Sequence, residues 1–186
     1  MTAGAAPLLS RAVTRLLQVL LLNPGRVYFQ RELERLTGES LRGVQQGLTR
    51  LTGEDLVVAV SMGGRPSYRA NEDNPYFLDL QRIAIRSLGI PEALDAAGVT
   101  ALKVLVFGSY AKGVAAPGSD LDVLIVGRER TRGDAEQALA PLSEKVGREI
   151  SVQIYDHARY LEEAAQPASF IASIAAGPTI DLRAAL

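Results

Sequence analysis

Two features of the sequence predict a mainly helical N-terminal part of about 72 residues, a helical connector and then an α/β domain. The first feature is periodicity: apolar residues recur every three or four positions near the N-terminus, whereas apolar runs alternate with helical stretches after residue 99. The second is charge: residues 1–70 hold nine arginines and five acidic residues, a net charge of about +4, in a chain of 186 residues whose net charge is −1. We therefore expect domains at 1–72 and 99–186, joined by residues 73–98, with different partners.

Composition excludes several classes of protein. The chain contains no cysteine, which rules out disulfides, thiol catalysis and a zinc site with cysteine ligands. Its longest apolar run, Leu16–Leu22, contains Gln18 and is far shorter than the roughly 20 residues that a membrane-spanning helix needs. No small-residue cleavage site follows this run, so we expect no signal peptide. A cytoplasmic location without a membrane partner is the resulting expectation.

The N-terminal part is predicted to begin with three helices. Apolar spacing gives a first helix over residues 8–22, ended by Asn23-Pro24-Gly25, and a second, shorter helix that ends at Gly38. Ser40 is a suitable N-cap for a third helix. The buried face of that helix would carry Leu41, Val44, Leu48 and Leu51. Two short helices joined at Gly38 have helix-turn-helix character.

A β-hairpin is predicted after these helices. Residues 56–60 form a strand, Gly63-Gly64 makes a turn, and residues 66–70 run back. Over about residues 8–72 this order of elements resembles a winged helix-turn-helix domain, in which the hairpin is the wing. The resemblance rests on element order and apolar spacing.

This resemblance implies double-stranded DNA as a partner, with the third helix in the major groove. The candidate DNA-binding side chains are Arg42, Gln45, Gln46, Thr49 and Arg50 on that helix, with Arg65 and Arg69 on the hairpin. Arginine and glutamine can read guanine and adenine edges, and the hairpin arginines would meet phosphates or the minor groove. Because one module covers one half-site, we expect a homodimer. The alternative is a winged helix used for protein contacts, with these side chains as a solvated face.

The connector is predicted to be helical. One helix begins near Asn74-Pro75 and stops at Gly89, and a shorter one runs from Pro91 to about Gly98. Their apolar spacing indicates a bridge between domains, or a dimer-forming helix, rather than a site.

The chemistry of the C-terminal part is concentrated in two neighbouring segments. The apolar run 102–107 reads as a strand and is broken by Gly108 and Ser109; a second strand runs over about residues 120–126. Residues two apart in a strand share a face, so Asp120 and Asp122 lie together. Two carboxylates at such a short distance repel each other, and a bound divalent cation such as Mg²⁺ (or Mn²⁺) would offset this repulsion. The Gly-Ser turn can hold phosphate oxygens through backbone amides and the serine hydroxyl. Together they suit phosphoryl or nucleotidyl transfer.

The pattern Gly-Ser-Tyr-Ala-Lys-Gly followed by Ser-Asp-Leu-Asp resembles the signature of the minimal members of the DNA polymerase β-like nucleotidyltransferase superfamily. The matching positions are Gly108, Ser109, Ala111, Gly113, Ser119, Asp120 and Asp122. The resemblance implies a domain with a mixed sheet and an NTP ligand, ATP being the first candidate. The expected nucleotide-binding residues are Gly108, Ser109, Lys112 and Ser119, and the expected metal ligands are Asp120 and Asp122. The plainer interpretation is a tight turn with an acidic cap on a strand.

The sequence offers a serine in place of the third carboxylate of this family. The family normally carries one on the strand after the following helix, as a general base or second-metal ligand, and alignment puts Ser151 at that position. Serine performs neither role well at neutral pH. Either Glu149, on the same face of the predicted strand, reaches in to complete a catalytic set with Asp120 and Asp122, or the site binds nucleotide and reacts slowly or not at all. We assign Tyr110 to packing, and His157 with Asp156 to a helix start.

Three functions remain open on the sequence. The first is an enzyme that moves a nucleoside monophosphate from an NTP to an unknown acceptor. The second is a transcriptional regulator whose second domain senses a nucleotide or dimerises. The third is an antitoxin-like protein whose acidic domain binds a partner protein.

Overall fold

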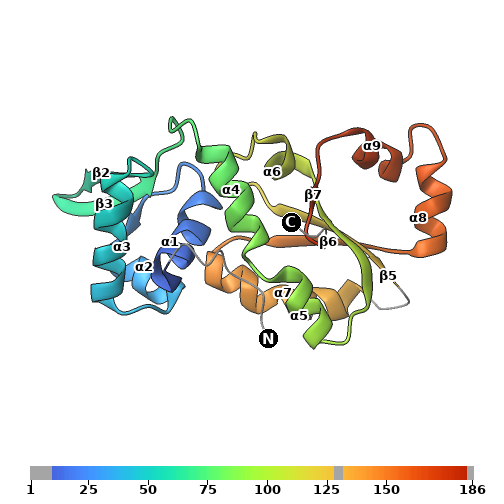
Figure 1. Ribbon diagram of the computed structural model, residues 1–186, viewed down its shortest axis with the longest axis horizontal. Coiled ribbons are helices and arrows are strands. Elements are labelled where there is room, and N and C mark those ends of the chain that lie inside the picture. The colour runs from blue at the N-terminus through green and yellow to red at the C-terminus, as the bar shows by residue number, and fades with distance from the viewer. Residues whose placement is uncertain (1–9, 128–131, 184–186) are drawn as a thin grey trace. The chain divides into compact units, whose positions relative to one another are not determined.

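The computed structural model describes residues 10–127 and 132–183, and every structural statement below concerns these residues. The chain divides into two compact units, coloured along the sequence in Figure 1. Unit 1 comprises the residues up to 88 with 116–118 and 144–148, and unit 2 comprises 89–115, 119–143 and the residues from 149 onward. The segment 73–98, expected as a connector, is thus shared between the units.

Unit 1 contains helices, and local capping chemistry sets some of their ends. They are α1 (Arg11–Leu21), α2 (Gln30–Thr37), α3 (Leu41–Gly53) and α4 (Phe77–Arg86). The hydroxyl of Ser10 accepts a hydrogen bond from the Val13 amide, so α1 begins later than the expected residue 8, which lies outside the described residues. Gly38 ends α2 with a left-handed φ of +64°, and the Ser40 hydroxyl caps α3 by accepting from the Gly43 amide at 3.2 Å.

A three-stranded antiparallel sheet completes unit 1. Its strands are β1 (Tyr28–Phe29), β2 (Val57–Met62) and β3 (Arg65–Ala70), in the order β1-β3-β2. Gly63 and Gly64, with φ of +59° and +73°, form the predicted hairpin turn, because both of its central residues need positive φ. The two-residue strand β1 was not predicted; it is a strand only through its pairing with β3. One buried cluster holds the unit together and includes Leu16, Leu20, Tyr28, Leu33, Val44 and Leu48.

Unit 2 is a mixed α/β structure, as predicted. Its strands are β4 (Ala101–Val106), β5 (Leu121–Gly127), β6 (Ile150–Asp156) and β7 (Ile180–Asp181). Its helices are α5 (Ile90–Ala96), α6 (Gly108–Lys112), α7 (Arg132–Val146, ending within unit 1), α8 (His157–Ala164) and α9 (Phe170–Ala176). The sheet order is β6-β5-β4-β7; β5 and β6 are parallel, and the other pairs are antiparallel. The short edge strand β7 was not predicted.

The central strand β5 is buried on both faces along most of its length. Leu121, Val123 and Ile125 are fully buried on one face, as alternation predicts. On the opposite face, Leu124 and Val126 continue from Asp122 and are buried under Ile171 and Ile174 of α9. Only the start of β5 is therefore open on the face that carries Asp122. None of the described helices is long and apolar enough to span a bilayer.

Candidate functional site

The sequence motifs around residues 108 and 122 meet in unit 2. Asp122 is the second residue of β5 and is half-buried, and Asp120 is exposed just before the strand. The Phe107 amide donates a hydrogen bond to the Asp122 carbonyl oxygen at 3.1 Å. Gly108 follows with φ +71°, and a Cβ at this position would collide with Asp122 Oδ2. Glycine therefore lets the β4–α6 turn lie directly against the Asp122 carboxylate.

The carboxylate pair is electrostatically unfavourable without a cation. Burial is the larger cause that raises the pKa of Asp122 above its usual 3.8, and the negative charge of Asp120 raises it further. A positive ion between the two groups would oppose both effects, since it favours the charged form.

The other expected nucleotide-binding residues lie near this turn in the sequence and differ in exposure. Ser109 is half-buried in α6, Lys112 is exposed at its end, and Ser119 is half-buried before Asp120. Tyr110 is 1% exposed, which agrees with the packing role expected for it. His157 is exposed at the start of α8, where the Asp156 carboxylate accepts a hydrogen bond from the Arg159 amide at 2.9 Å, as a helix cap does.

Comparison with known proteins agrees with this geometry. Residues 91–173 match the family described as nucleotidyltransferase domain, and the match includes both motifs. The chain carries a nucleotidyltransferase-family domain. The matched segment covers less than half of the chain and none of α1 to α4. Neither a curated protein nor a solved structure matched the chain.

Within this nucleotidyltransferase domain, Ser151 lies beside Asp122. The two residues are register partners in the parallel β5–β6 pair, so their side chains share a face. Glu149 is exposed just before β6, where its carbonyl oxygen accepts a hydrogen bond from the Leu121 amide at 2.9 Å. The described residues hold no group of three or more His, Asp or Glu side chains arranged to bind a metal. The carboxylates brought together are therefore the pair Asp120 and Asp122.

Sequence analysis missed an aromatic pair that includes Phe107, the residue whose amide bonds the Asp122 carbonyl oxygen. The rings of Phe107 and Phe170 are 5.7 Å apart and nearly perpendicular, at 82°. Phe107 precedes Gly108 directly, whereas Phe170 begins α9, about fifty residues after Asp122. The only available signal was the break in apolar patterning before α9, which does not identify a partner.

On unit 1, all five candidate DNA-binding residues of α3 are exposed: Arg42, Gln45, Gln46, Thr49 and Arg50. The Thr49 hydroxyl donates to the Gln45 carbonyl oxygen of its own helix at 2.9 Å. In the hairpin, the exposed Arg65 stacks over the Phe29 ring at 4.5 Å. Arg69 is half-buried and donates to the Ala70 carbonyl oxygen at 3.2 Å, so it is already engaged locally.

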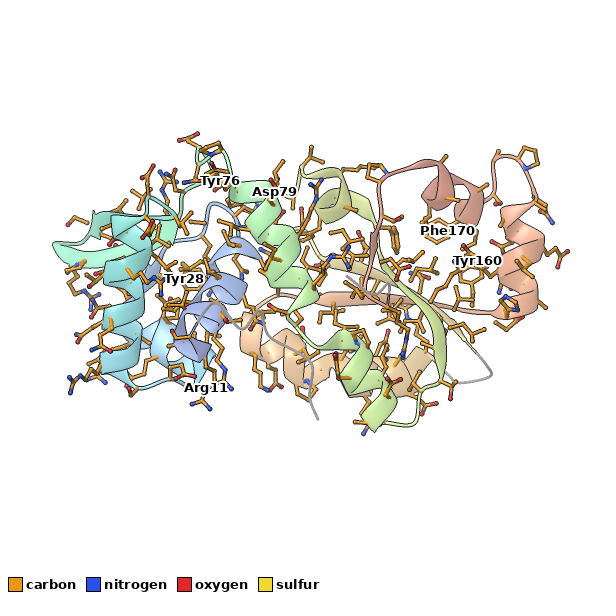
Figure 2. The ribbon with its side chains drawn as sticks, in the orientation of Figure 1. Arg11, Tyr28, Tyr76, Asp79, Tyr160 and Phe170 are labelled. Atoms are coloured by element: carbon orange, nitrogen blue, oxygen red, sulfur yellow. The ribbon has the colours of Figure 1, made fainter. Side chains whose placement is uncertain are left out.

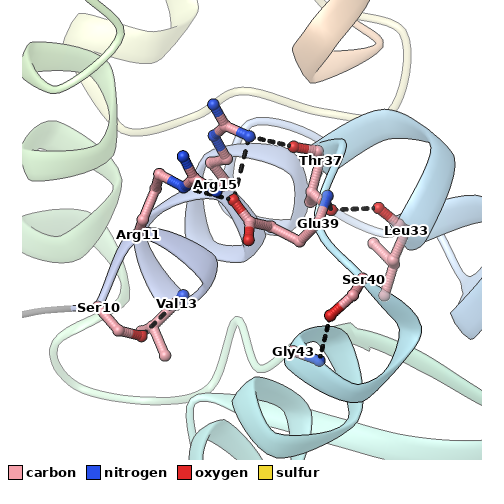
Figure 3. A network of polar contacts seen from close by, with 9 residues as sticks. All are labelled: Ser10, Arg11, Val13, Arg15, Leu33, Thr37, Glu39, Ser40 and Gly43. Carbon is pink, nitrogen blue, oxygen red and sulfur yellow. Dashed lines mark hydrogen bonds and ion pairs between the residues drawn. The ribbon is translucent and has the colours of Figure 1, made fainter.

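An ionic network, which sequence analysis also missed, fixes the turn between α2 and α3 (Figure 3). The Arg15 guanidinium donates to the Thr37 carbonyl oxygen at 2.8 Å and to Glu39 Oε1 at 3.0 Å. Arg11 contacts the same carboxylate oxygen at 2.9 Å. Since the Arg15 side chain belongs to α1, these contacts hold the turn between α2 and α3 against the first helix.

Proposed function

We propose that this protein binds an NTP with a divalent cation in unit 2 and transfers a nucleoside monophosphate to an acceptor, and that unit 1 is a winged helix-turn-helix domain that binds double-stranded DNA. The observation that carries the first half is the close packing of Gly108 on the Asp122 carboxylate, beside Asp120, within the nucleotidyltransferase-family segment. The transfer would break the bond between the α-phosphorus and the bridging oxygen, release pyrophosphate and form a new bond from that phosphorus to an acceptor oxygen.

The residues present suit a magnesium or manganese ion. Carboxylate oxygens are the ligands that these hard cations prefer, and Asp120 and Asp122 supply them on one face. When bound, the ion would neutralise phosphate charge. Gly108 brings the backbone of its turn against the Asp122 carboxylate, so a phosphate held by the bound ion would lie close to that backbone, and the Ser109 hydroxyl could donate to it. Lys112 is exposed and would add positive charge.

A regulator that senses a nucleotide is the second candidate, and Ser151 favours it. Ser151 is the register partner of Asp122 and carries a neutral hydroxyl, and the family resemblance implies a carboxylate at this position. A serine at that position removes the family's usual proton acceptor and leaves cation binding to two residues. For the enzyme, Glu149 would have to act as the base instead, from its exposed position before β6.

The enzyme and the regulator share a first test. Isothermal titration calorimetry, in which each NTP is added to the protein with Mg²⁺ and ATP is tried first, should show metal-dependent binding. The double variant Asp120→Asn/Asp122→Asn should lose this binding. Asp73→Asn is the matched control, because it removes an exposed carboxylate of unit 1 that the proposal gives no role. A wild type that binds none of the four NTPs with Mg²⁺ or Mn²⁺ would overturn the proposal for unit 2. Release of pyrophosphate then separates the enzyme from the sensor.

The DNA proposal is supported by the exposed row of polar and basic side chains on α3. Phosphate contacts make binding salt-dependent, and each lost contact lowers the slope of log K against log salt by about one. Arg42→Ala should therefore weaken binding to genomic DNA fragments, measured by fluorescence anisotropy, whereas Arg31→Ala, on the neighbouring α2 and paired with Glu34, should not. Equal binding by both variants would favour a protein-contact role for unit 1.

We also propose that two copies pair through α4. Tyr76 and Ile83, 66% and 46% exposed, form one stripe with Leu80 beside an apolar hollow of about 400 Å³. An antiparallel pairing that sets Tyr76 against Ile83 of the second copy also brings Asp79 near Arg82 of that copy. This charge pattern is self-complementary, as a two-fold interface requires. In sedimentation experiments Ile83→Asp should then be monomeric, and a monomeric wild type would refute the pairing.

A further inference from the structure

One face of the unit 2 sheet changes from polar to apolar along its strands. Leu105 of β4 pairs with Leu124 of β5, so these side chains share the face that also carries Asp122. Phe107 continues the alternation of β4 in extended backbone, with φ −131° and ψ −166°. It packs against the buried cluster that includes Leu124 and Ile171. Phe107 therefore lies at the border between the carboxylates and the apolar part of this face.

Phe170 lies at the same border and remains partly in solvent. It contacts Phe107 edge to face and is 44% exposed, although Ile171 and Ile174 of its own helix are buried. Figure 2 shows Phe170 at the start of α9, with Tyr160 on the neighbouring α8. A perpendicular pair covers at most one face of one ring, so ring surface stays available for a further aromatic partner. A flat, apolar ligand group would cover the ring surface that Phe170 leaves in solvent.

We propose that Phe170 stacks on the base of the nucleotide bound at Asp120 and Asp122, an inference that rests on the function proposed above. The ligand would then be recognised as a nucleotide rather than as a bare polyphosphate. Because purines offer a larger π surface than pyrimidines, ATP and GTP should bind more tightly than CTP and UTP. Stacking on an aromatic side chain tolerates different bases, so Phe170 contributes affinity and only a modest purine preference.

The absence of tryptophan from the sequence allows a direct test. In Phe170→Trp the new indole is the sole tryptophan, and Mg²⁺-ATP should quench its fluorescence, whereas Mg²⁺-tripolyphosphate, which has no base, should not. Leu161→Trp is the matched control: Leu161 is an apolar residue, 54% exposed on α8, and its variant should show no quenching. In calorimetry, Phe170→Ala should bind ATP about tenfold more weakly and tripolyphosphate as the wild type does.

The outcomes separate this inference from the function on which it rests. If the wild type and Phe170→Ala bind ATP equally well, base stacking is refuted while the nucleotide site stands. Phe170→Leu keeps an apolar side chain at the start of α9. If this variant loses the binding of both ATP and tripolyphosphate, Phe170 has a structural role and base stacking is also refuted. If the wild type binds neither ligand, both proposals fail together. Thermal melts of each variant establish that it is folded.

Discussion

The contact between Gly108 and Asp122 makes a sharp prediction for Gly108→Ala. The left-handed φ of +71° costs a non-glycine residue about 1–2 kcal/mol. The added Cβ would also collide with Asp122 Oδ2 and lie 3.2 Å from the carboxyl carbon. Because Oδ2 is the end of a rotatable side chain, the carboxylate can turn away. Displacement of the carboxylate then relieves most of the clash, and the total loss of stability should be about 2–3 kcal/mol.

Gly64→Ala provides the matched comparison. Gly64 has nearly the same φ, +73°, and an added Cβ there would meet no atom within 4 Å. Its substitution should therefore cost the backbone strain of about 1–2 kcal/mol and nothing more. The two losses are compared as shifts of the urea midpoint from that of the wild type.

Nucleotide binding distinguishes the two variants more clearly than stability does. Gly108→Ala should lose Mg²⁺-NTP binding at least tenfold, because the carboxylate is displaced and phosphate loses its approach to the backbone. Gly64→Ala should bind as the wild type does. If Gly108→Ala is folded and binds the NTP normally, the turn is not a phosphate site, and the argument from Gly108 is refuted.

Three further predictions concern charge. The raised pKa of Asp122 means that the folded state holds the proton more tightly than the unfolded state, so stability falls as pH rises from 3.8 through the folded-state pKa. In urea melts, Asp122→Asn should therefore be more stable than the wild type at neutral pH and lose this pH dependence, whereas a pH profile equal to that of the wild type would contradict the prediction. Ser151→Asp adds a third carboxylate in register with Asp122 and should tighten Mn²⁺ binding about tenfold by calorimetry, with no change as the contrary result. Glu39→Gln removes the partner of Arg11 and Arg15 and should cost about 1–2 kcal/mol of stability in thermal melts, whereas an unchanged midpoint would assign the network no energetic role.

The helices of unit 1 could be predicted because their ends depend on neighbouring residues. Gly38 supplies the left-handed conformation and Ser40 the cap, and both act within a few residues of themselves. By contrast, β1 and β7 have two residues each and exist through pairing with β3 and β4. A pattern of period two cannot be detected in two residues, so these strands depend on the folded chain.

In the candidate site, too, the local features could be predicted and the contacts between distant segments could not. The spacing of Asp120 and Asp122 and the glycine that begins α6 identified this part of the site, because both are local features of the sequence. The register of Ser151 beside Asp122 depends on the pairing of two strands, and its alignment with the family's third carboxylate stays a prediction. Phe170 could not be found in this way, because its contact with Phe107 joins segments more than sixty residues apart. The predicted roles of all these residues stay predictions until a ligand is measured.

The two carboxylates bear on the choice between enzyme and sensor. Burial and then the negative charge of Asp120 oppose the charged form of Asp122, so the unliganded site is less stable than one with a neutral side chain. A chain that used unit 2 only to dimerise would gain stability from losing one of the two carboxylates.

A sensor keeps both carboxylates, and its two binding sites must be coupled: if Mg²⁺-NTP changes the affinity for DNA by some factor, DNA must change the affinity for Mg²⁺-NTP by the same factor. An enzyme that merely carries a DNA-binding domain needs no such coupling. Measuring both affinities, each with and without the other ligand, therefore separates the two functions without knowledge of the acceptor.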